Sequence, residues 1–162
     1  VILNVTLKLD KNPVFKVSYG AIQDVLDRKG ITDLSIRAIS DAVIEIRQSK
    51  LPDPAQIGNS GSFFKNPEVS TDEFKRLKSE FPDIVSYPID ANTVKIPAGW
   101  LIDRAGWKGF TRGQIGVHKN QALVLVNYGD GQGRDLKILA YEILDSIEDK
   151  YGLRLTPEVN IL

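Results

Sequence analysis

The chain has 162 residues, of which 42% are hydrophobic and 26% are charged, and these fractions are typical of a globular protein rather than a disordered, collagenous or coiled-coil one. Its 21 basic residues balance 21 acidic ones, so no net charge favours nucleic acid or an anionic membrane as a partner. The absence of cysteine excludes a disulfide framework and a thiol nucleophile, and no apolar run approaches the roughly 20 residues of a membrane-spanning helix.

The first segment is a run of β-forming residues. Residues 1–9 alternate loosely between apolar and polar and predict a strand that ends at the turn signal of residues 10–13. No initiator methionine and no signal-peptide pattern stand before this run. We therefore interpret the chain as an excised piece of a longer protein.

Two helices are predicted next. Apolar residues at helical spacing predict a helix from Tyr19 to Lys29 that stops at Gly30. A second helix is predicted from about Ile36 to Gln48, where Ser35 can cap the free N–H groups. Two prolines in residues 50–54 cannot continue this helix, so we place a domain boundary there.

The middle of the chain mixes helices with short strands. Residues 58–67 are interpreted as a loop of small residues that leads into two phenylalanines. The capping box from Ser70 to Glu73 predicts a helix over 71–80. The further predictions are a strand at 93–96, a helix from Pro97 to Arg104, and strands at 114–118 and 122–127.

The strand at 122–127 is a near-continuous apolar run, which predicts a central position in its sheet. A flexible glycine-rich turn is predicted at 129–134, then a long helix over 135–151 that Gly152 ends, then an extended segment over 153–162. Strands and helices do not alternate strictly. The predicted fold class is therefore α+β, with a mixed, largely antiparallel sheet and helices packed on it.

Several site patterns fail on inspection. The glycines after strand 122–127 do not fit G-x-G-x-x-G from Gly129 or from Gly131, so a nucleotide cradle is disfavoured there. His118 is the only histidine, and no Asp/Glu cluster at ligand spacing accompanies it, so we predict no metal site. The nucleophile elbow G-x-S-x-G is absent, which makes a serine hydrolase a weak interpretation.

Three features leave two interpretations open. The loop at 58–67 is either an ordinary turn or a ligand loop in which Ser62, Lys65 and Asn66 donate hydrogen bonds. Lys50 is either a solvated lysine at a helix end or a site residue. Glu158 stands in an apolar tail and either faces inward or, as is commoner for a single glutamate, points to solvent.

Five segments in order resemble one known family. They are residues 50–54 (KLPDP), 58–67 (GNSGSFFKNP), 98–103 (AGWLID), 121–127 (QALVLVN) and 157–159 (PEV). They resemble the UDP-N-acetylenolpyruvoylglucosamine reductase (UDP-N-acetylmuramate dehydrogenase) family, and the block at 61–67 is the most specific of them. The resemblance implies a domain division of 1–49 as the tail of an FAD-binding domain, 50–152 as the substrate-binding C-terminal domain, and 153–162 as a terminal segment with the catalytic glutamate.

The resemblance also implies the chemistry and its residues. In the family, NADPH reduces FAD, and the flavin passes hydride to the enolpyruvyl group of UDP-N-acetylglucosamine enolpyruvate in bacterial peptidoglycan precursor synthesis in the cytoplasm. Ser62 would be the proton donor, and Glu158 would hydrogen-bond the developing enolic carboxylate. The implied substrate-binding residues are Lys50, Asn66, Tyr87, Lys108 and Gln121. Tyr87 belongs to a loop that resembles the longer subclass of the family, in which a tyrosine closes over the substrate.

One departure limits what this chain can do alone. The family's FAD-phosphate loops, and the arginine that partners the glutamate, have no counterpart here. We therefore expect FAD to be bound mainly by a missing N-terminal domain, and the chain by itself neither to bind FAD tightly nor to turn over. Two alternatives remain: a stand-alone nucleotide-sugar binding module without redox activity, and a purely structural or interaction domain.

Overall fold

The computed structural model describes residues 2–18 and 20–161. The chain divides into two compact units between residues 49 and 50, and each is described by itself. The predicted ends at Val1 and Leu162, and the predicted helix start at Tyr19, lie outside the described residues. No helix in the described ranges combines the length and the apolar character that crossing a bilayer requires.

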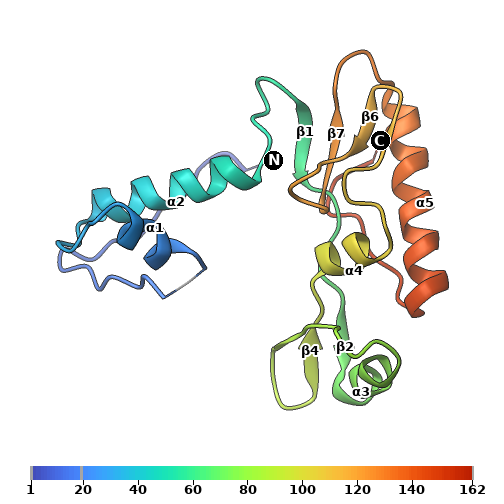
Figure 1. Cartoon of the computed structure of the whole chain (residues 1–162), viewed down its shortest axis with the longest axis horizontal. Helices are drawn as coiled ribbons and strands as arrows, with labels where there is room; N and C mark the ends of the chain where they lie inside the picture. The colour runs from blue at the N-terminus through green and yellow to red at the C-terminus, as the bar shows by residue number, and fades with distance from the viewer. Residues whose placement is uncertain (1, 19, 162) are drawn as a thin grey trace. The chain divides into compact units, whose positions relative to one another are not determined.

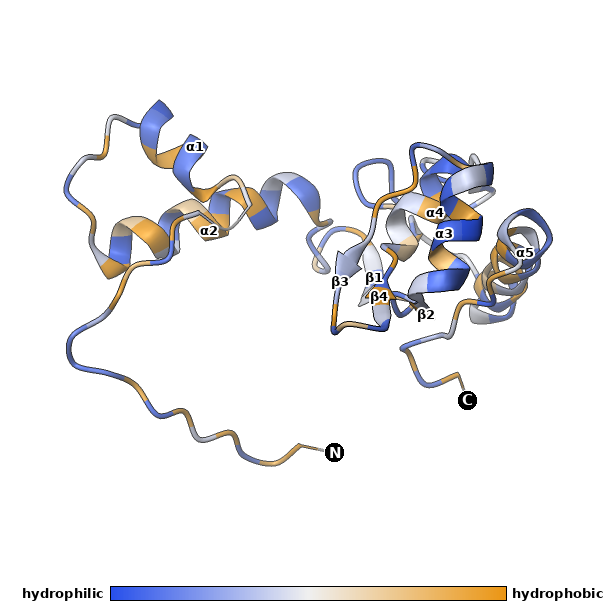
Figure 2. Cartoon of the chain, turned by 90° about the horizontal axis from the view of Figure 1, so that it is seen from below, coloured by the Kyte–Doolittle hydropathy of each residue, from blue (hydrophilic) through white to orange (hydrophobic). Residues whose placement is uncertain are grey.

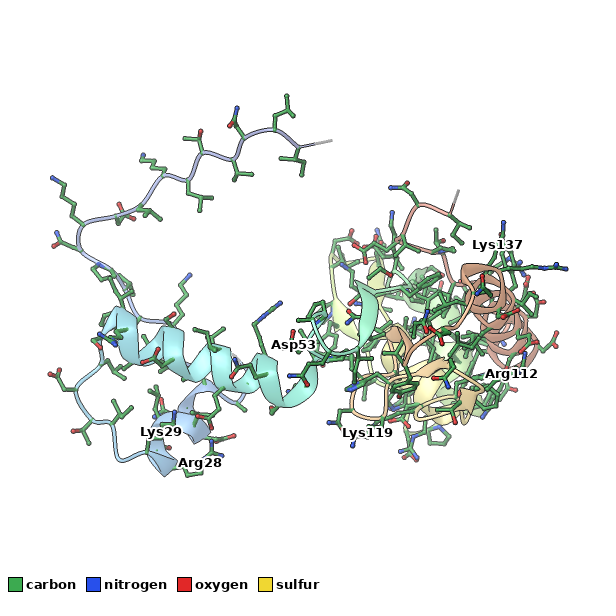
Figure 3. The ribbon with its side chains drawn as sticks, turned by 90° about the horizontal axis from the view of Figure 1, so that it is seen from above. Arg28, Lys29, Asp53, Arg112, Lys119 and Lys137 are labelled. Carbon is green, nitrogen blue, oxygen red and sulfur yellow. The ribbon has the colours of Figure 1, made fainter. Side chains whose placement is uncertain are left out.

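The first unit is a pair of helices that follows an extended segment. Helix α1 is Ile22–Arg28, shorter than predicted, and α2 is Ile36–Lys50, which Ser35 caps through a 3.1 Å hydrogen bond from the Ala38 N–H to its hydroxyl oxygen. Hydrophobic residues lie where the two helices meet (Figure 2). They form a small core of Ile22, Val25, Leu26 and Ala42. Arg28 and Lys29 at the end of α1 (Figure 3) form ion pairs with Glu45 of α2.

The predicted strand at the start of the chain is wrong for the described residues 2–9. These residues have no regular secondary structure, and Ile2 and Leu3 are more than four-fifths exposed, at 83% and 85%. A strand needs a neighbour that takes its N–H and C=O groups, and no described strand pairs with this segment. A β-forming pattern without a partner is therefore left extended.

The second unit contains two antiparallel sheets in place of the single sheet that was predicted. The larger sheet has the order β1-β7-β6-β5, with β1 at Gly58–Ser62, β5 at Thr111–Arg112, β6 at Ile115–Val117 and β7 at Val124–Asn127. The smaller has the order β2-β4-β3, with β2 at Glu68–Ser70, β3 at Tyr87–Pro88 and β4 at Thr93–Lys95. The α+β class is confirmed, and every pairing between the described strands is antiparallel.

Three helices complete this unit (Figure 1): α3 at Thr71–Glu80 beside β2 and β4, α4 at Ala98–Arg104, and α5 at Gly133–Tyr151 along β6 and β7. Leu139, Ile143 and Ile147 of α5 recur at helical spacing and are fully buried in the main core. As predicted, β7 is central, and its first three residues are buried. The helix ends also follow the sequence signals, since Ser70 caps α3 and Gly152 closes α5 in the left-handed region at φ +69°.

Part of the predicted loop at 58–67 is strand β1. Glycine and serine are poor strand formers, so the local sequence does not indicate a strand. Pairing with the buried strand β7 overrides this preference. The register shifts between Asn59 and Ser62, where Gly61 adopts φ +75°, and this irregularity precedes the two buried phenylalanines Phe63 and Phe64.

The glycine-rich turn after β7 had been predicted to be a flexible connection, but in the structure its backbone is hydrogen-bonded. The Asn127 side chain accepts hydrogen bonds at 3.1 Å from the N–H groups of Gly129 and Gly131, and it donates one at 2.7 Å to the Gly131 carbonyl oxygen. A Cβ at Gly131 would lie 2.6 Å from the Ile115 side chain. The turn is therefore held by one asparagine and by close packing.

Candidate functional site

A groove of about 370 Å³ lies in the second unit where α4 begins. It is lined by residues from four separate stretches of the chain, among them Asn66, Gly99, Asp103, Lys108 and Gln121. Three of these, Asn66, Lys108 and Gln121, are residues for which the family resemblance implies substrate contacts. The fold thus brings together three side chains that are up to 55 positions apart in the sequence.

Asn66 is held at the groove by the start of α4. Its side-chain oxygen accepts a 2.9 Å hydrogen bond from the Ala98 N–H. The preceding residue, Pro97, has no N–H, so Ala98 carries the first backbone donor of this helix. Because the carbonyl end of the amide is engaged in this way, the NH₂ group is the end that Asn66 can offer to a ligand.

Gln121 stands on the turn between β6 and β7. Its backbone N–H donates to the His118 carbonyl oxygen at 3.3 Å, and its carbonyl oxygen accepts from the Val124 N–H at 3.1 Å. Its side-chain oxygen faces the Leu123 N–H at 3.4 Å. Here too the oxygen of the amide is turned to the backbone, which leaves the NH₂ group for a ligand.

Gly99 keeps the groove open between α4 and this turn. A Cβ at position 99 would lie 3.4 Å from Cγ of Leu123 and 3.5 Å from the side-chain oxygen of Gln121. A methyl group would be in ordinary contact, but any longer side chain would enter the space that the groove residues line. Gly99 was not among the residues predicted from the sequence, although it lies within the quoted segment 98–103.

Lys108 lies on a turn that follows α4. Its ammonium nitrogen is 2.9 Å from a carboxylate oxygen of Asp103, the penultimate residue of α4. The turn is anchored by its neighbour Trp107, whose indole N–H donates to the Ser146 hydroxyl of α5 at 3.1 Å. Asp103 was not singled out from the sequence, although it is the last residue of the quoted segment 98–103 and stands five residues before Lys108.

The two predicted catalytic residues lie on neighbouring extended segments. The Glu158 N–H donates to the Phe63 carbonyl oxygen at 2.8 Å, and Phe64 pairs with Pro157, so the tail runs antiparallel beside the end of β1. Ser62 directly precedes Phe63. The Glu158 side chain is exposed, so the inward-facing alternative is wrong for this structure. Ser62 is exposed as well.

This pair of segments also reaches the groove. The Phe63 N–H donates at 2.8 Å to the carbonyl oxygen of Leu123, and Leu123 is a groove residue. Ser62 therefore sits one residue away from a backbone bond to the groove wall. The other two predicted substrate residues are not among those that line the groove: Lys50 ends α2, and Tyr87, in β3, is 63% exposed.

The described residues offer no cradle for a cofactor diphosphate at the glycine turn. The N–H groups of Gly129 and Gly131 already donate to Asn127, so they cannot serve a phosphate without breaking those bonds. No group of three or more His, Cys, Asp and Glu side chains in the described ranges is arranged to hold a metal ion. His118 is buried, and burial, with the charge of Lys119, lowers its pKa below the ordinary value.

Comparison with known proteins identifies the family. Residues 53–162 match the family described as UDP-N-acetylenolpyruvoylglucosamine reductase, C-terminal domain. Proteins named UDP-N-acetylenolpyruvoylglucosamine reductase are 48% identical in Amoebophilus asiaticus over 100% of this chain and 48% of the relative, and 48% identical in Porphyromonas gingivalis over 99% and 47%. One from Pseudomonas aeruginosa is 44% identical over 99% of the chain and 48% of its own length. The chain thus spans about half the length of these relatives, and it belongs to the UDP-N-acetylenolpyruvoylglucosamine reductase family.

Proposed function

We propose that this chain is the substrate-binding part of a flavin-dependent reductase that converts UDP-N-acetylglucosamine enolpyruvate to UDP-N-acetylmuramate in the bacterial cytoplasm, for peptidoglycan precursor synthesis. The single observation that carries the proposal is the groove, because it gathers Asn66, Lys108 and Gln121 in a chain of this family. In the proposal 1–49 belongs to the FAD-binding domain, 50–152 binds substrate, and 153–162 carries the catalytic glutamate.

The groove would bind the phosphate and sugar groups of the nucleotide-sugar, which are charged or rich in hydrogen-bond acceptors. The side chains of Asn66, Gln121 and Lys108 line it, and the side-chain oxygens of the two named amides, Asn66 and Gln121, are engaged by backbone N–H groups, which leaves their NH₂ groups and the Lys108 ammonium group as donors. Such donors match phosphate and sugar oxygens, which accept hydrogen bonds. Lys50 and Tyr87 are proposed as additional contacts made from outside the groove.

Ser62 and Glu158 would act next to this groove. In the proposal, the Ser62 hydroxyl gives its proton to the carbon adjacent to the substrate carboxylate, while the Glu158 carboxyl group hydrogen-bonds that carboxylate as it becomes enolic. The backbone bond between Glu158 and Phe63 keeps the two segments side by side. Both side chains are exposed to solvent, where a substrate can reach them.

The reducing half of the reaction is assigned to another part of the longer protein. The family implies FAD and NADPH, but the glycine turn of this chain does not fit a cofactor diphosphate, because Asn127 occupies its N–H groups. The proposed partner is therefore the N-terminal FAD domain of the same protein. No step of the reduction is assigned to residues of this chain.

A chimera tests the proposal. This chain would replace the aligned half of the Porphyromonas gingivalis relative, which is 48% identical to it. We expect the chimera to oxidise NADPH only when the enolpyruvyl substrate is present. In the Ser62→Ala chimera the turnover rate should fall by about 100-fold or more, while substrate binding is retained. The chain alone is expected to show no turnover.

The same experiment separates the alternatives. Substrate binding by the chimera without any turnover would favour a nucleotide-sugar binding module. Unchanged turnover in the Ser62→Ala chimera would show that Ser62 takes no part in the reaction.

A second experiment is a titration of the enolpyruvyl substrate into the 162-residue chain, followed by backbone amide chemical shifts. The signals of residues 66, 99, 108 and 121 should shift, and unchanged signals at these positions would contradict the assignment of the groove.

A further inference from the structure

We infer that Asp103 is a positioning residue that holds the Lys108 ammonium group at the groove wall for an anionic ligand. The inference rests on the proposed function of the groove. Asp103 accepts a 2.9 Å ion-paired hydrogen bond from Lys108, and both residues line the groove. An ammonium group has three N–H donors, so one donor binds Asp103 and two remain for a ligand.

The charges that line the groove bear on the role of Asp103. Among its lining residues Asp103 carries a negative charge and Lys108 a positive one, so the wall has no net charge to attract an anion. A carboxylate at the wall also repels any phosphate that enters. By charge alone, the Asp103 carboxylate is therefore unfavourable at an anion site. An effect of Asp103 on the position of Lys108 would compensate for this repulsion.

Asp103 also gains nothing from its place in α4. It is the penultimate residue of that helix, where the helix dipole favours cations rather than carboxylates. Its side chain is 49% exposed, so it contributes little to packing. Lys108 is the ion-pair partner that the described structure gives it.

Other residues already fix the backbone of Lys108, but among the described residues its side chain has no such anchor beyond the pair with Asp103. Trp107 and Phe110 hold the turn, since the Phe110 N–H donates to the Trp107 carbonyl oxygen at 2.9 Å and the two rings meet edge to face at 5.0 Å. The Lys108 side chain has four rotatable bonds beyond this anchor and is 36% exposed. Ordering it on ligand binding costs rotamer entropy, which the pair with Asp103 removes in advance.

The two roles predict opposite signs for one substitution. If Asp103 is only a negative charge beside the groove, Asp103→Ala removes repulsion and an anionic ligand binds more tightly. If Asp103 positions Lys108, the same substitution weakens binding. Because Asp103 is exposed and lies in a helix, alanine is compatible with the fold.

The experiment is a titration of UDP-N-acetylglucosamine into the 162-residue chain, with uridine as a ligand that lacks phosphate. We expect Asp103→Ala to weaken UDP-N-acetylglucosamine binding by about threefold to tenfold and to leave uridine binding unchanged. Asp103→Glu should recover most of the affinity. In a Lys108→Met chain, Asp103→Ala should no longer weaken binding, because its target has been removed.

Three other outcomes of this titration would contradict the positioning role of Asp103 or the proposed function of the groove. Equal or tighter binding of UDP-N-acetylglucosamine by Asp103→Ala would overturn the positioning role while leaving the proposed function intact. An equal loss for uridine would overturn it too, since that result indicates a general disturbance of the groove. If the unsubstituted chain binds neither ligand, the proposed function of the groove fails, and this inference fails with it.

Discussion

The side-chain oxygen of Asn66 and the backbone N–H of Ala98 form a 2.9 Å hydrogen bond between residues 32 positions apart. This bond joins the segment after β1 to the first turn of α4, and it orients the Asn66 amide. One residue thus serves the fold through its oxygen and the proposed ligand site through its nitrogen. Substitutions can separate these two functions.

We expect Asn66→Ala to lower the free energy of unfolding by about 0.5–2 kcal/mol, because the Ala98 N–H loses its partner. Asn66→Asp keeps an oxygen acceptor for that N–H and should retain most of the stability. The aspartate has no NH₂ donor and adds a negative charge, so its affinity for UDP-N-acetylglucosamine should fall by about tenfold or more. Urea unfolding and ligand titration of both variants measure the two effects. Equal ligand affinity in Asn66→Asp and the unsubstituted chain would contradict the donor role.

Gly99 should control access to the groove. Gly99→Leu places a side chain beyond the point where a Cβ already lies 3.4 Å from Leu123, so it should lower affinity for UDP-N-acetylglucosamine by about tenfold or more. Gly99→Ala is the matched control, since its methyl group makes only ordinary contacts. We expect that control to bind as well as the unsubstituted chain. Full binding by Gly99→Leu would show that the ligand lies elsewhere.

Gly116 should tolerate no side chain. A Cβ at this position in β6 would lie 2.4 Å from the backbone carbonyl oxygen of Phe110, which cannot move without breaking the β5–β6 hairpin. We expect Gly116→Ala to lower the free energy of unfolding by about 1–3 kcal/mol or more.

Gly133→Ala is the control for this substitution. Gly133 begins α5, a Cβ there meets nothing within 4 Å, and the change should be neutral or stabilise by up to about 1 kcal/mol. Both tryptophans of the chain lie in the second unit, so urea unfolding followed by their fluorescence reports on that unit alone. Equal stability of the two alanine variants would show that the hairpin relaxes around residue 116.

His118 should make the second unit more stable at neutral than at mildly acidic pH. Burial, and then the charge of Lys119, lower its pKa below 6.5, so the folded state keeps the neutral ring while the unfolded chain takes up a proton. Its contribution is therefore complete above pH 6.5 and is lost as the pH falls through the lowered pKa. In the neutral ring, Nδ1 can accept from the Asn120 N–H, 3.4 Å away.

The measurement is urea unfolding between about pH 5 and pH 7.5, compared with His118→Asn. Asparagine has an acceptor and no charge change in this range, so the difference in unfolding free energy between the two proteins should vary with pH. A constant difference across the range would indicate that the histidine does not titrate differently in the folded and unfolded states.

Features that depend on residues close together in the chain could be predicted before the structure was known. Ser70 predicted the start of α3, Gly152 predicted the end of α5, and the apolar run at 122–127 predicted the central strand. Capping, helix termination and continuous burial are each visible within a few positions of one segment. The family resemblance came from five such segments and agrees with the comparisons.

Features that depend on residues far apart in the chain became visible only in the folded protein. Strand β1 forms from glycine and serine because β7 supplies its partner, whereas the strand-like residues 2–9 remain extended because no described strand pairs with them. The groove forms where Asn66, Gly99, Lys108 and Gln121, from four separate stretches of the chain, come together. The Lys108 side chain is paired there with Asp103. Local preference for backbone conformation is weak, and a partner that takes up hydrogen bonds or charge outweighs it. Such partners are identified only when the chain is folded.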